Sequence, residues 1–447
     1  MTDLNLLTAT QAAKMIRAGE LSSEDLVKDC LERINLVDKD VQAWTRLNTE
    51  YALDQARSSD EHRRSGAPTG PLHGVPIGVK DIFDTKDYPT QYGTPLHKDR
   101  KTTQDATAVA MLRQAGAIVL GKTVTAEFAI LSPGKTKNPH DPTRTPGGSS
   151  SGSAAAVASG MVPLSLGTQT NGSIIRPASY CGVVGYKPTF GLVSRHRVLR
   201  TSRNLDHVGA FARTLEDVAL MAETIIGFDV NDADTSLSPK PDLVAKSNED
   251  VLMPPRFAFV KGPAWTQCDP VTQEAYGELF DLLGDQVQEV DLGPVYDEVF
   301  EWQRLVMEAD IAKNLFDDYQ RGAEHISPIL KDLIERGRKV HAVDYSLALD
   351  RMAMFGQALT GLFAEFDAII TPAATGEAPV GLKSTGNPAC ATLWTFAGMP
   401  ALSLPLLQGE NGMPLGVQMV SARGDDARLF RNANWLTKYV EKLTNED

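Results

Sequence analysis

Apolar and polar positions along the chain alternate between helical and extended patterns. Two helical patterns occupy the first forty residues, and each follows a hydroxyl side chain that can cap a helix: Ala12–Ile16 follows Thr8, and Leu26–Ile34 follows Ser22. Short apolar runs bounded by turn-forming residues recur later, as is typical of buried strands. This alternation predicts α/β layers, and we expect one large domain over residues 1–447.

The remaining expected elements follow from the same patterns. Apolar runs predict strands at Val75–Val79, Ala117–Leu120, Arg256–Val260, Asp367–Ile370, Ala401–Leu404 and Gly416–Val420. Helical periodicity predicts helices at Ala106–Gln114, Ala154–Ala158, Trp302–Tyr319, Ile329–Val340 and Ala427–Lys442. The polar stretches Ser58–Gly70 and Asp229–Pro255 are rich in turn formers, so we expect surface loops there.

Composition is that of a globular protein. The chain has 447 residues, of which 42% are hydrophobic and 23% are charged, and this excludes a largely disordered or fibrous protein. The net charge of −13 argues against nucleic acid or an anionic membrane as a partner, because both favour a basic surface. We find no apolar run long enough to span a bilayer.

Cysteine usage and the first residues indicate a cytoplasmic protein. The four cysteines are far apart and form no CxxC pair, so we expect reduced thiols rather than a disulfide framework. Met1–Leu7 has no basic segment followed by an apolar stretch, so we expect no secretory signal. The oligomeric state is left open, with a homodimer among the alternatives.

Metal and phosphate chemistry find little support in the sequence. The eight histidines are scattered without HxxxH or HExxH spacing, and no carboxylate cluster has EF-hand spacing, so we expect no metal and no cofactor. Gly116–Thr123 matches GxxxxGK[ST], the pattern of a phosphate-binding loop. Its four variable positions are apolar and are expected to form a strand, so their N–H groups would pair within a sheet and could not bind phosphate. Gly148–Gly152 matches GxSxG around Ser150, but Asp141–Pro146 precedes it instead of the strand that a nucleophile elbow requires.

Three other segments carry candidate chemistry. Lys80 ends an apolar strand, and burial there would lower its pKa and suit it to act as a base. Gly147–Ser153 is rich in glycine and serine and leads into a helix, whose N-terminus presents backbone N–H groups. Ser173 follows an Asn-Gly turn, where an exposed hydroxyl and neighbouring amides can converge on one point. Taken separately, each also fits an ordinary alternative: a lysine that pairs with Asp81 or reaches solvent, a flexible linker, and a loop serine.

In order and spacing, Lys80, Ser149 and, twenty-four residues later, Ser173 resemble the amidase signature family. The segments that resemble it are GVPIGVKD, NPHDPTRTPGGSSSGSAAAVASG, LGTQTNGSIIRPASYCGVVGYKPTFGLVS, TFAGMPALSLP and GVQMVSARGDD. The resemblance is close over Leu72–Ser194 and looser over the last sixty residues. It implies a single α/β/α domain with a mixed, mostly parallel central sheet covered by helices on both faces. It further implies a signature core at about 72–194 and a variable substrate-pocket region at about 231–365.

The resemblance also implies a role for each site residue. Ser173 matches the acylated nucleophile, Ser149 the bridging serine, which the family holds in a cis peptide, and Lys80 the terminal base. The backbone amides of Thr170, Asn171, Gly172 and Ser173 match the oxyanion hole, and Ser150 matches a residue that supports Ser149 by a hydrogen bond. Two positions depart from the family pattern, since Ser151 and Asn171 stand where glycine is commoner. Asparagine tolerates a positive φ, so we expect the oxyanion hole to survive.

These matches imply an amidohydrolase that cleaves the C–N bond of a carboxylic amide through an acyl-enzyme. Two alternatives are the A subunit of a glutamyl-tRNA amidotransferase-like complex, which would need a partner, and a catalytically inactive scaffold. The TQTNGSIIRP segment is closer to stand-alone amidases than the SDTGGSIRQP form. The expected partner is a small-molecule amide, with aryl amides, carbamates, ureido acids and esters left open. Candidates for an apolar pocket wall, each also suited to core packing, are Trp302, Met307, Phe316, Trp394 and Phe396.

Overall fold

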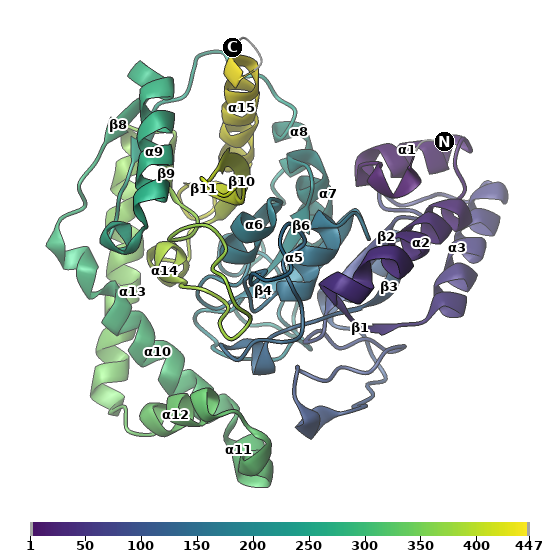
Figure 1. Cartoon of the computed structure of the whole chain (residues 1–447), viewed down its shortest axis with the longest axis horizontal. Helices are drawn as coiled ribbons and strands as arrows, with labels where there is room; N and C mark the ends of the chain where they lie inside the picture. The colour runs from purple at the N-terminus through teal and green to yellow at the C-terminus, as the bar shows by residue number, and fades with distance from the viewer. Residues whose placement is uncertain (1–2, 445–447) are drawn as a thin grey trace.

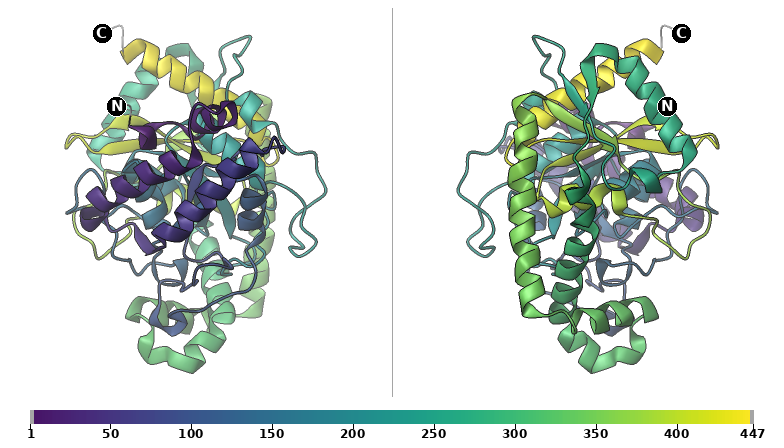
Figure 2. Two further views of the ribbon diagram at one scale, coloured as in Figure 1. Left: turned by 90° about the vertical axis from the view of Figure 1, so that its right-hand side faces the viewer. Right: turned by 90° about the vertical axis from the view of Figure 1, so that its left-hand side faces the viewer.

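A mixed β-sheet runs through the molecule and carries helices on both faces (Figures 1 and 2). The computed structural model of the protein describes residues 3–444; Met1 and Thr2, which belong to the segment tested for a secretory signal, and residues 445–447 lie outside this range. Within it, eleven strands pair in the order β1-β3-β2-β4-β6-β5-β10-β11-β9-β7-β8. Their bounds are β1 Trp44–Leu47, β2 Pro76–Lys80, β3 Ile118–Thr123, β4 Leu164–Gln169, β5 Val184–Lys187, β6 His207–Ala212, β7 Phe257–Phe259, β8 Val287–Glu289, β9 Ala368–Pro372, β10 Ala401–Gln408 and β11 Pro414–Val420.

The predicted mixed sheet covered by helices is confirmed. Parallel pairing forms two blocks, β3-β2-β4 and β9-β7-β8, and the strands between them pair antiparallel. The expectation of a mostly parallel sheet therefore describes these two blocks and not the centre. The helices are α1 Ala9–Ala18, α2 Ser23–Val41, α3 Thr49–Arg64, α4 Thr107–Gln114, α5 Ser151–Ala158, α6 Ile175–Cys181, α7 Leu215–Ile225, α8 Leu243–Lys246, α9 Pro270–Leu283, α10 Val299–Asn314, α11 Phe316–Gly322, α12 Pro328–Gly337, α13 Ala342–Thr360, α14 Ala389–Phe396 and α15 Asp426–Thr444.

Both predicted N-terminal helices are present with the expected caps. The Thr8 side chain accepts from Gln11 N while Gln11 Oε1 accepts from Thr8 N, and the Ser22 side chain accepts from Asp25 N. The predicted loop at Ser58–Gly70 is wrong for its first half, because α3 continues to Arg64. The polar side chains in this stretch suggested a loop, but they lie on α3, a surface helix that buries few of its residues.

Two predicted long helices are shorter than expected. The pattern over Trp302–Tyr319 spans two helices, because α10 ends at Asn314 and α11 begins at Phe316. The pattern over Ile329–Val340 forms α12, which starts at Pro328 and ends at Gly337. Proline at the first turn of α12 suits a helix start, since its missing N–H would have no partner there.

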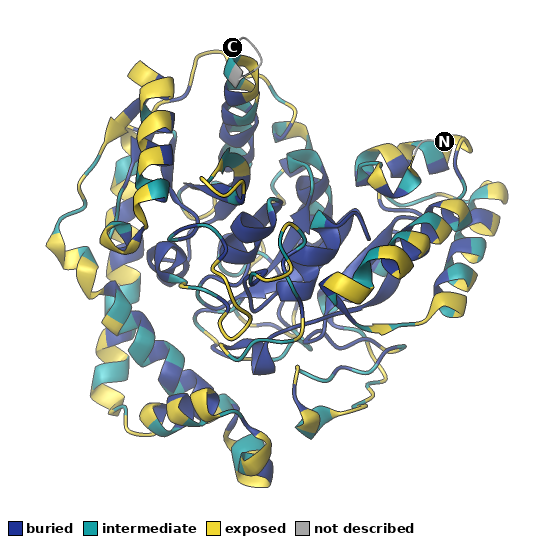
Figure 3. Ribbon diagram, in the orientation of Figure 1, coloured by how far each residue is buried: buried dark blue, intermediate teal, exposed yellow. Residues whose placement is uncertain are grey.

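Opposite faces of the sheet carry different cores. Ile77 and Val79 of β2 and Leu164 and Leu166 of β4 belong to the core on one face, with α4, α7 and α15. On the other face, the short helices α5 and α6 are almost entirely buried, and Figure 3 shows both in the dark blue of buried residues. The loops that enter these two helices hold the candidate serines, so the candidate site lies on this second face.

Candidate active site

Lys80 ends strand β2, and its side chain is completely buried. Alternate residues of a strand face opposite sides of the sheet, and Val79 packs into the first core, so Lys80 projects from the second face. Its Nζ atom lies 2.8 Å from Ser149 Oγ, 3.0 Å from Ser150 Oγ and 2.8 Å from Thr168 Oγ1. The structure thus brings together Lys80, Ser149 and Ser150, as the sequence predicts, and adds Thr168.

The serine-rich loop is ordered by backbone contacts. Gly147 has a φ of +80°, and a Cβ there would lie 2.8 Å from Pro177 Cα, so only glycine fits this turn. The Gly148–Ser149 peptide bond is cis, as the family resemblance implies. The Ser149 carbonyl accepts a hydrogen bond from Ala126 N at 3.1 Å. Helix α5 begins at Ser151, so this loop leads directly into a buried helix and is not a flexible linker.

Burial sets the charge state of Lys80. Removal from water lowers the pKa of Lys80 well below its ordinary value, and the negative charge of Asp206 opposes this shift. The alternative that Lys80 pairs with Asp81 is wrong. Asp81 Oδ1 instead lies 3.1 Å from the buried Lys122 Nζ. Lys80 is therefore surrounded by hydroxyl groups, and burial favours its neutral amine form more strongly than in a lysine that faces water.

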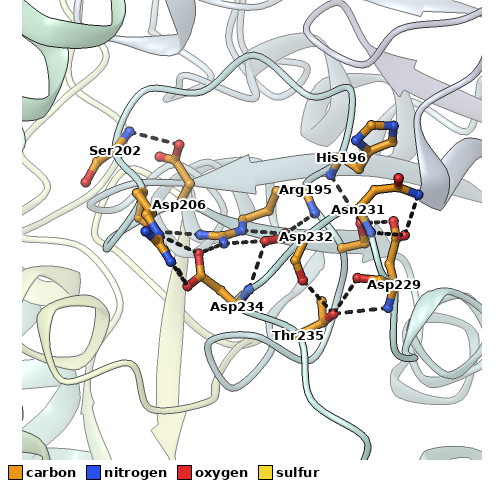
Figure 4. Close-up of polar contacts among 11 residues, drawn as sticks. Arg195, His196, Ser202, Asp206, Asp229, Asn231, Asp232, Asp234 and Thr235 are labelled. Carbon is orange, nitrogen blue, oxygen red and sulfur yellow. Dashed lines mark hydrogen bonds and ion pairs between the residues drawn. The ribbon is translucent and has the colours of Figure 1, made fainter.

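Asp206 is a partly buried carboxylate next to the candidate nucleophile loop. It accepts hydrogen bonds from Thr170 Oγ1 at 2.6 Å, Thr201 N at 2.8 Å and Ser202 N at 2.9 Å. Burial raises the pKa of Asp206 to about 6, against the lowering effect of these bonds. Figure 4 shows the nearby Arg195 directed at Asp232 and Asp234, while Asp206 faces the Ser202 backbone.

The candidate nucleophile loop joins β4 to α6. Ser173 lies just before α6 and is 8% exposed, so its hydroxyl sits at the edge of the buried core. Among the residues that the structure describes, no acceptor receives the N–H groups of Asn171, Gly172 and Ser173. Gly172 and Ser173 are buried, and buried backbone N–H groups are nearly always paired, so these free donors indicate a site for a ligand oxygen. Neither Asn171 nor Gly172 has a positive φ, so the absence of glycine at position 171 imposes no backbone strain.

Four side chains around this loop were not predicted as site residues. They are Thr168 and Gln169 at the end of β4, Arg176 in α6, and Asp206. Arg176 is 2% exposed; its Nη2 atom donates to Gly148 O at 2.5 Å and to Thr385 Oγ1 at 3.2 Å. Within residues 3–444, Nε and Nη1 of Arg176 have no hydrogen-bond partner, and burial lowers its pKa to about 10. A charged residue inside the otherwise apolar Ile174–Ala178 was the one signal that could have singled out Arg176.

Other sequence patterns prove structural. Lys122 of the GxxxxGK[ST] match lies in β3 and donates to Phe83 O and Thr90 Oγ1, so it faces no open phosphate site. The resemblance implies a hydrogen bond from Ser150 to Ser149, but within residues 3–444 the Ser150 hydroxyl bonds other groups. Ser150 Oγ donates to Thr168 O at 3.1 Å and accepts from Lys80 Nζ and Thr168 N. Of the five apolar wall candidates, Trp394 and Phe396 are core residues, Trp302 and Met307 are partly buried against the core, and Phe316 is exposed.

The described residues contain neither a membrane-spanning helix nor a cluster of metal-binding side chains. No helix between residues 3 and 444 is long and apolar enough to cross a membrane. Over the same residues, no group of three or more His, Cys, Asp or Glu side chains could hold a metal ion.

Comparison with known proteins identifies the family. The sequence model of the Amidase family matches residues 25–430. The chain is 33% identical over 474 residues to the A subunit of the glutamyl-tRNA(Gln) amidotransferase of Chloroflexus aggregans, with 96% of each chain covered. It superposes on the peptide amidase of Stenotrophomonas maltophilia with a TM-score of 0.85 and 27% identity, covering 98% of this chain and 97% of that one. A chain from a vestigial protein complex, described as revealing the evolutionary origins of an s-triazine catabolic enzyme, gives a TM-score of 0.90 at 29% identity, covering 97% and 98%. The protein belongs to the amidase family, whose members include hydrolases that act on amides.

Proposed function

We propose that this protein is an amidohydrolase in which Ser173 attacks the amide carbonyl and Lys80 and Ser149 move the protons. The observation that carries the proposal is the contact of 2.8 Å between Ser149 Oγ and the Nζ of a lysine whose pKa burial holds well below its ordinary value. A neutral amine has a lone pair that can take a proton from Ser149. The other two groups within hydrogen-bond distance of Lys80 Nζ are the hydroxyls of Ser150 and Thr168, which are far weaker bases than an amine.

The proposed reaction begins at Ser173, and its protons move through Ser149 to Lys80. Neutral Lys80 takes the proton of Ser149 Oγ while Ser149 takes that of Ser173, and Ser173 Oγ forms a bond to the carbonyl carbon. The same relay returns the proton to the nitrogen as the C–N bond breaks, releasing ammonia or an amine and leaving an acyl group on Ser173. Water then attacks the acyl-enzyme by the same route and releases a carboxylic acid.

The oxyanion formed during attack would be held by backbone N–H groups of Thr170–Ser173. The free donors at Asn171, Gly172 and Ser173 support this part of the proposal. Ser150 supports the relay by holding Lys80, since its Oγ also bonds both the carbonyl and the N–H of Thr168. With three fixed hydroxyl partners, the Lys80 amine stays within reach of Ser149.

We assign substrate choice to the variable region at 231–365, which contributes helices α8–α13 and packs beside the signature core at 72–194. Aliphatic amides, aryl amides, carbamates and ureido acids are the classes to screen with the purified protein. The four buried free thiols support a cytoplasmic location. A homodimer is an outcome that gel filtration of the lone chain would reveal.

A second candidate function is that of an amidotransferase A subunit. The relative from Chloroflexus aggregans, which matches nearly the whole chain, favours it. The two functions differ in whether the isolated chain hydrolyses amides without a partner subunit. Each gel-filtration peak of the recombinant chain is assayed against the amide panel; turnover by the isolated chain supports the amidohydrolase, and turnover only with an added partner supports the amidotransferase function.

A covalent probe tests the nucleophile. We expect a fluorophosphonate to label Ser173, with mass spectrometry placing the adduct on the peptide that contains residues 170–176. Ser173→Ala should abolish both labelling and amide turnover, while the matched control Ser151→Ala should keep labelling, because Ser151 Oγ bonds Val124 O and lies outside the relay. An adduct on Ser150 in the wild-type protein would contradict the assignment.

A further inference from the structure

Helix α14 packs against the candidate nucleophile loop, and a buried hydroxyl on this helix bonds the backbone of the loop. Thr395, near the end of α14, is fully buried, and its Oγ1 donates to the carbonyl oxygen of Asn171 at 2.6 Å. The same Oγ1 accepts a hydrogen bond from Gln169 Nε2 at 2.8 Å. A continuous chain of hydrogen bonds therefore runs from Gln169 through Thr395 to the Asn171 carbonyl.

The direction of this chain is fixed by the other end of Gln169. Its Oε1 accepts from Ile174 N at 2.7 Å and from Ile175 N at 3.0 Å. The amide oxygen must face these two donors, so the NH₂ group faces Thr395. Because the Thr395 oxygen accepts a hydrogen bond from the Gln169 N–H, the single hydroxyl hydrogen of Thr395 is left to donate to the Asn171 carbonyl.

The Asn171 carbonyl and the Gly172 N–H belong to the same peptide group. In a trans peptide these two groups point in opposite directions across one plane. Holding the carbonyl against α14 therefore turns the Gly172 N–H away from α14, and this N–H has no acceptor within residues 3–444. A hydrogen bond to the carbonyl also polarises the peptide and makes its N–H a stronger donor.

Two other contacts hold α14 against the loop. Thr392 Oγ1 lies 2.8 Å from Asn171 Oδ1, which can accept its hydroxyl hydrogen, and 3.3 Å from Pro388 O at the start of its own helix. A Cβ on Gly172 would lie 3.1 Å from Pro388 Cβ, so the backbone of the loop passes close to the start of the helix. Of these contacts, only the one from Thr395 reaches the peptide group that carries the free N–H.

We propose that Thr395 and Gln169 are positioning residues that aim and polarise the Gly172 N–H of the oxyanion hole. The inference rests on the proposed function, because an oxyanion must form on Ser173 for this donor to matter. It adds a requirement that the Lys80–Ser149 relay does not contain, namely a hydroxyl at position 395 and an amide N–H at position 169.

The test compares near-isosteric variants of the whole chain with a fluorophosphonate, whose phosphoryl oxygen occupies the oxyanion hole during attack. Thr395→Val keeps the side-chain volume but removes the hydroxyl. We expect the rate of Ser173 labelling to fall roughly 10- to 100-fold, which is somewhat less than the effect of removing an oxyanion-hole donor itself. Thr395→Ser keeps the hydroxyl and should restore most of the rate. Thr392→Val is the matched control on the same helix and should have a clearly smaller effect, since it leaves the Asn171 peptide bonded to Thr395.

Gln169→Glu keeps the acceptor for Ile174 N and Ile175 N but replaces the donor to Thr395 with an oxygen that competes for its proton. The Gln169→Glu variant should slow labelling as Thr395→Val does. If Thr395→Val does not fold, Gln169→Glu tests the inference in its place. For an amide that the wild type hydrolyses, the loss should appear in kcat with KM little changed. Wild-type labelling rates in both variants, or a Thr395→Ser variant as slow as Thr395→Val, would overturn the inference. Absence of Ser173 labelling in the wild-type protein would instead refute the proposed function.

Discussion

Replacing Lys80 with methionine tests the base assigned to this site. Methionine keeps an unbranched side chain of similar length in the buried position but has no basic atom. The change removes the three contacts of Nζ with Ser149, Ser150 and Thr168. Each such hydrogen bond contributes about 0.5–1.5 kcal/mol net, and this loss is partly offset because no amine has to be buried. We expect the variant to fold.

The expected size of the effect on rate follows from the proposed role of the Lys80 amine as general base. Loss of a general base typically costs about 10²–10⁴-fold, or about 2.7–5.4 kcal/mol of transition-state stabilisation. An ordinary lysine, with a pKa of about 10.4, is neutral in only about one molecule in 2,500 at pH 7. Burial lowers the pKa of Lys80, so a far larger share of wild-type molecules should be active at that pH.

The assay is amide hydrolysis across roughly pH 6–10, the range that a lowered lysine pKa would cover. In the wild type, the rate should rise with pH as Lys80 loses its proton, with a midpoint below the ordinary lysine value. Lys80→Met should lose this rising limb, and amides should suffer more than esters, because the amine leaving group needs a proton. A variant with the same rising limb and near-normal amide turnover would refute the assignment of Lys80 as base.

Three further variants probe the surroundings of the relay. Ser149→Ala should lower amide turnover as much as Lys80→Met or somewhat less, since a water molecule can partly bridge the gap; undiminished turnover in steady-state assays would exclude Ser149 from the relay. Asp206→Asn removes the charge that stabilises the Lys80 ammonium, so the rising limb of the pH–rate profile should move to lower pH, and a shift to higher pH would contradict this electrostatic assignment. Arg176→Met removes a buried cation that contacts Gly148 O and, within residues 3–444, no carboxylate. Thermal unfolding should therefore show unchanged or higher stability, while fluorophosphonate labelling slows by up to about 100-fold. A large loss of stability with normal labelling would show that Arg176 serves the fold alone.

Local sequence determined the elements whose apolar positions have a clear period. The caps at Thr8 and Ser22 depend on residues three apart in the chain, so they could be predicted without the fold. The strands that carry Lys80 and Lys122 read as continuous apolar runs because parallel neighbours and helices bury them on both faces. The serine-rich loop and Ser173 were identified through the resemblance to a family, since neither segment is distinctive alone.

Tertiary structure decided what lies around these residues. Helix α14 has no polar face to give it a period, and Thr395 reaches Asn171 across a separation of 224 residues, which no local pattern contains. The sequence alone left open whether Lys80 pairs with Asp81 or with hydroxyl groups. The fold decided this, because Asp81 pairs with Lys122 while Lys80 contacts Ser149. The lowered pKa of Lys80 has the same origin, because burial is a property of the packed chain and not of the residue. The sequence therefore determined which groups could react, and the packing of distant segments determined their protonation and direction.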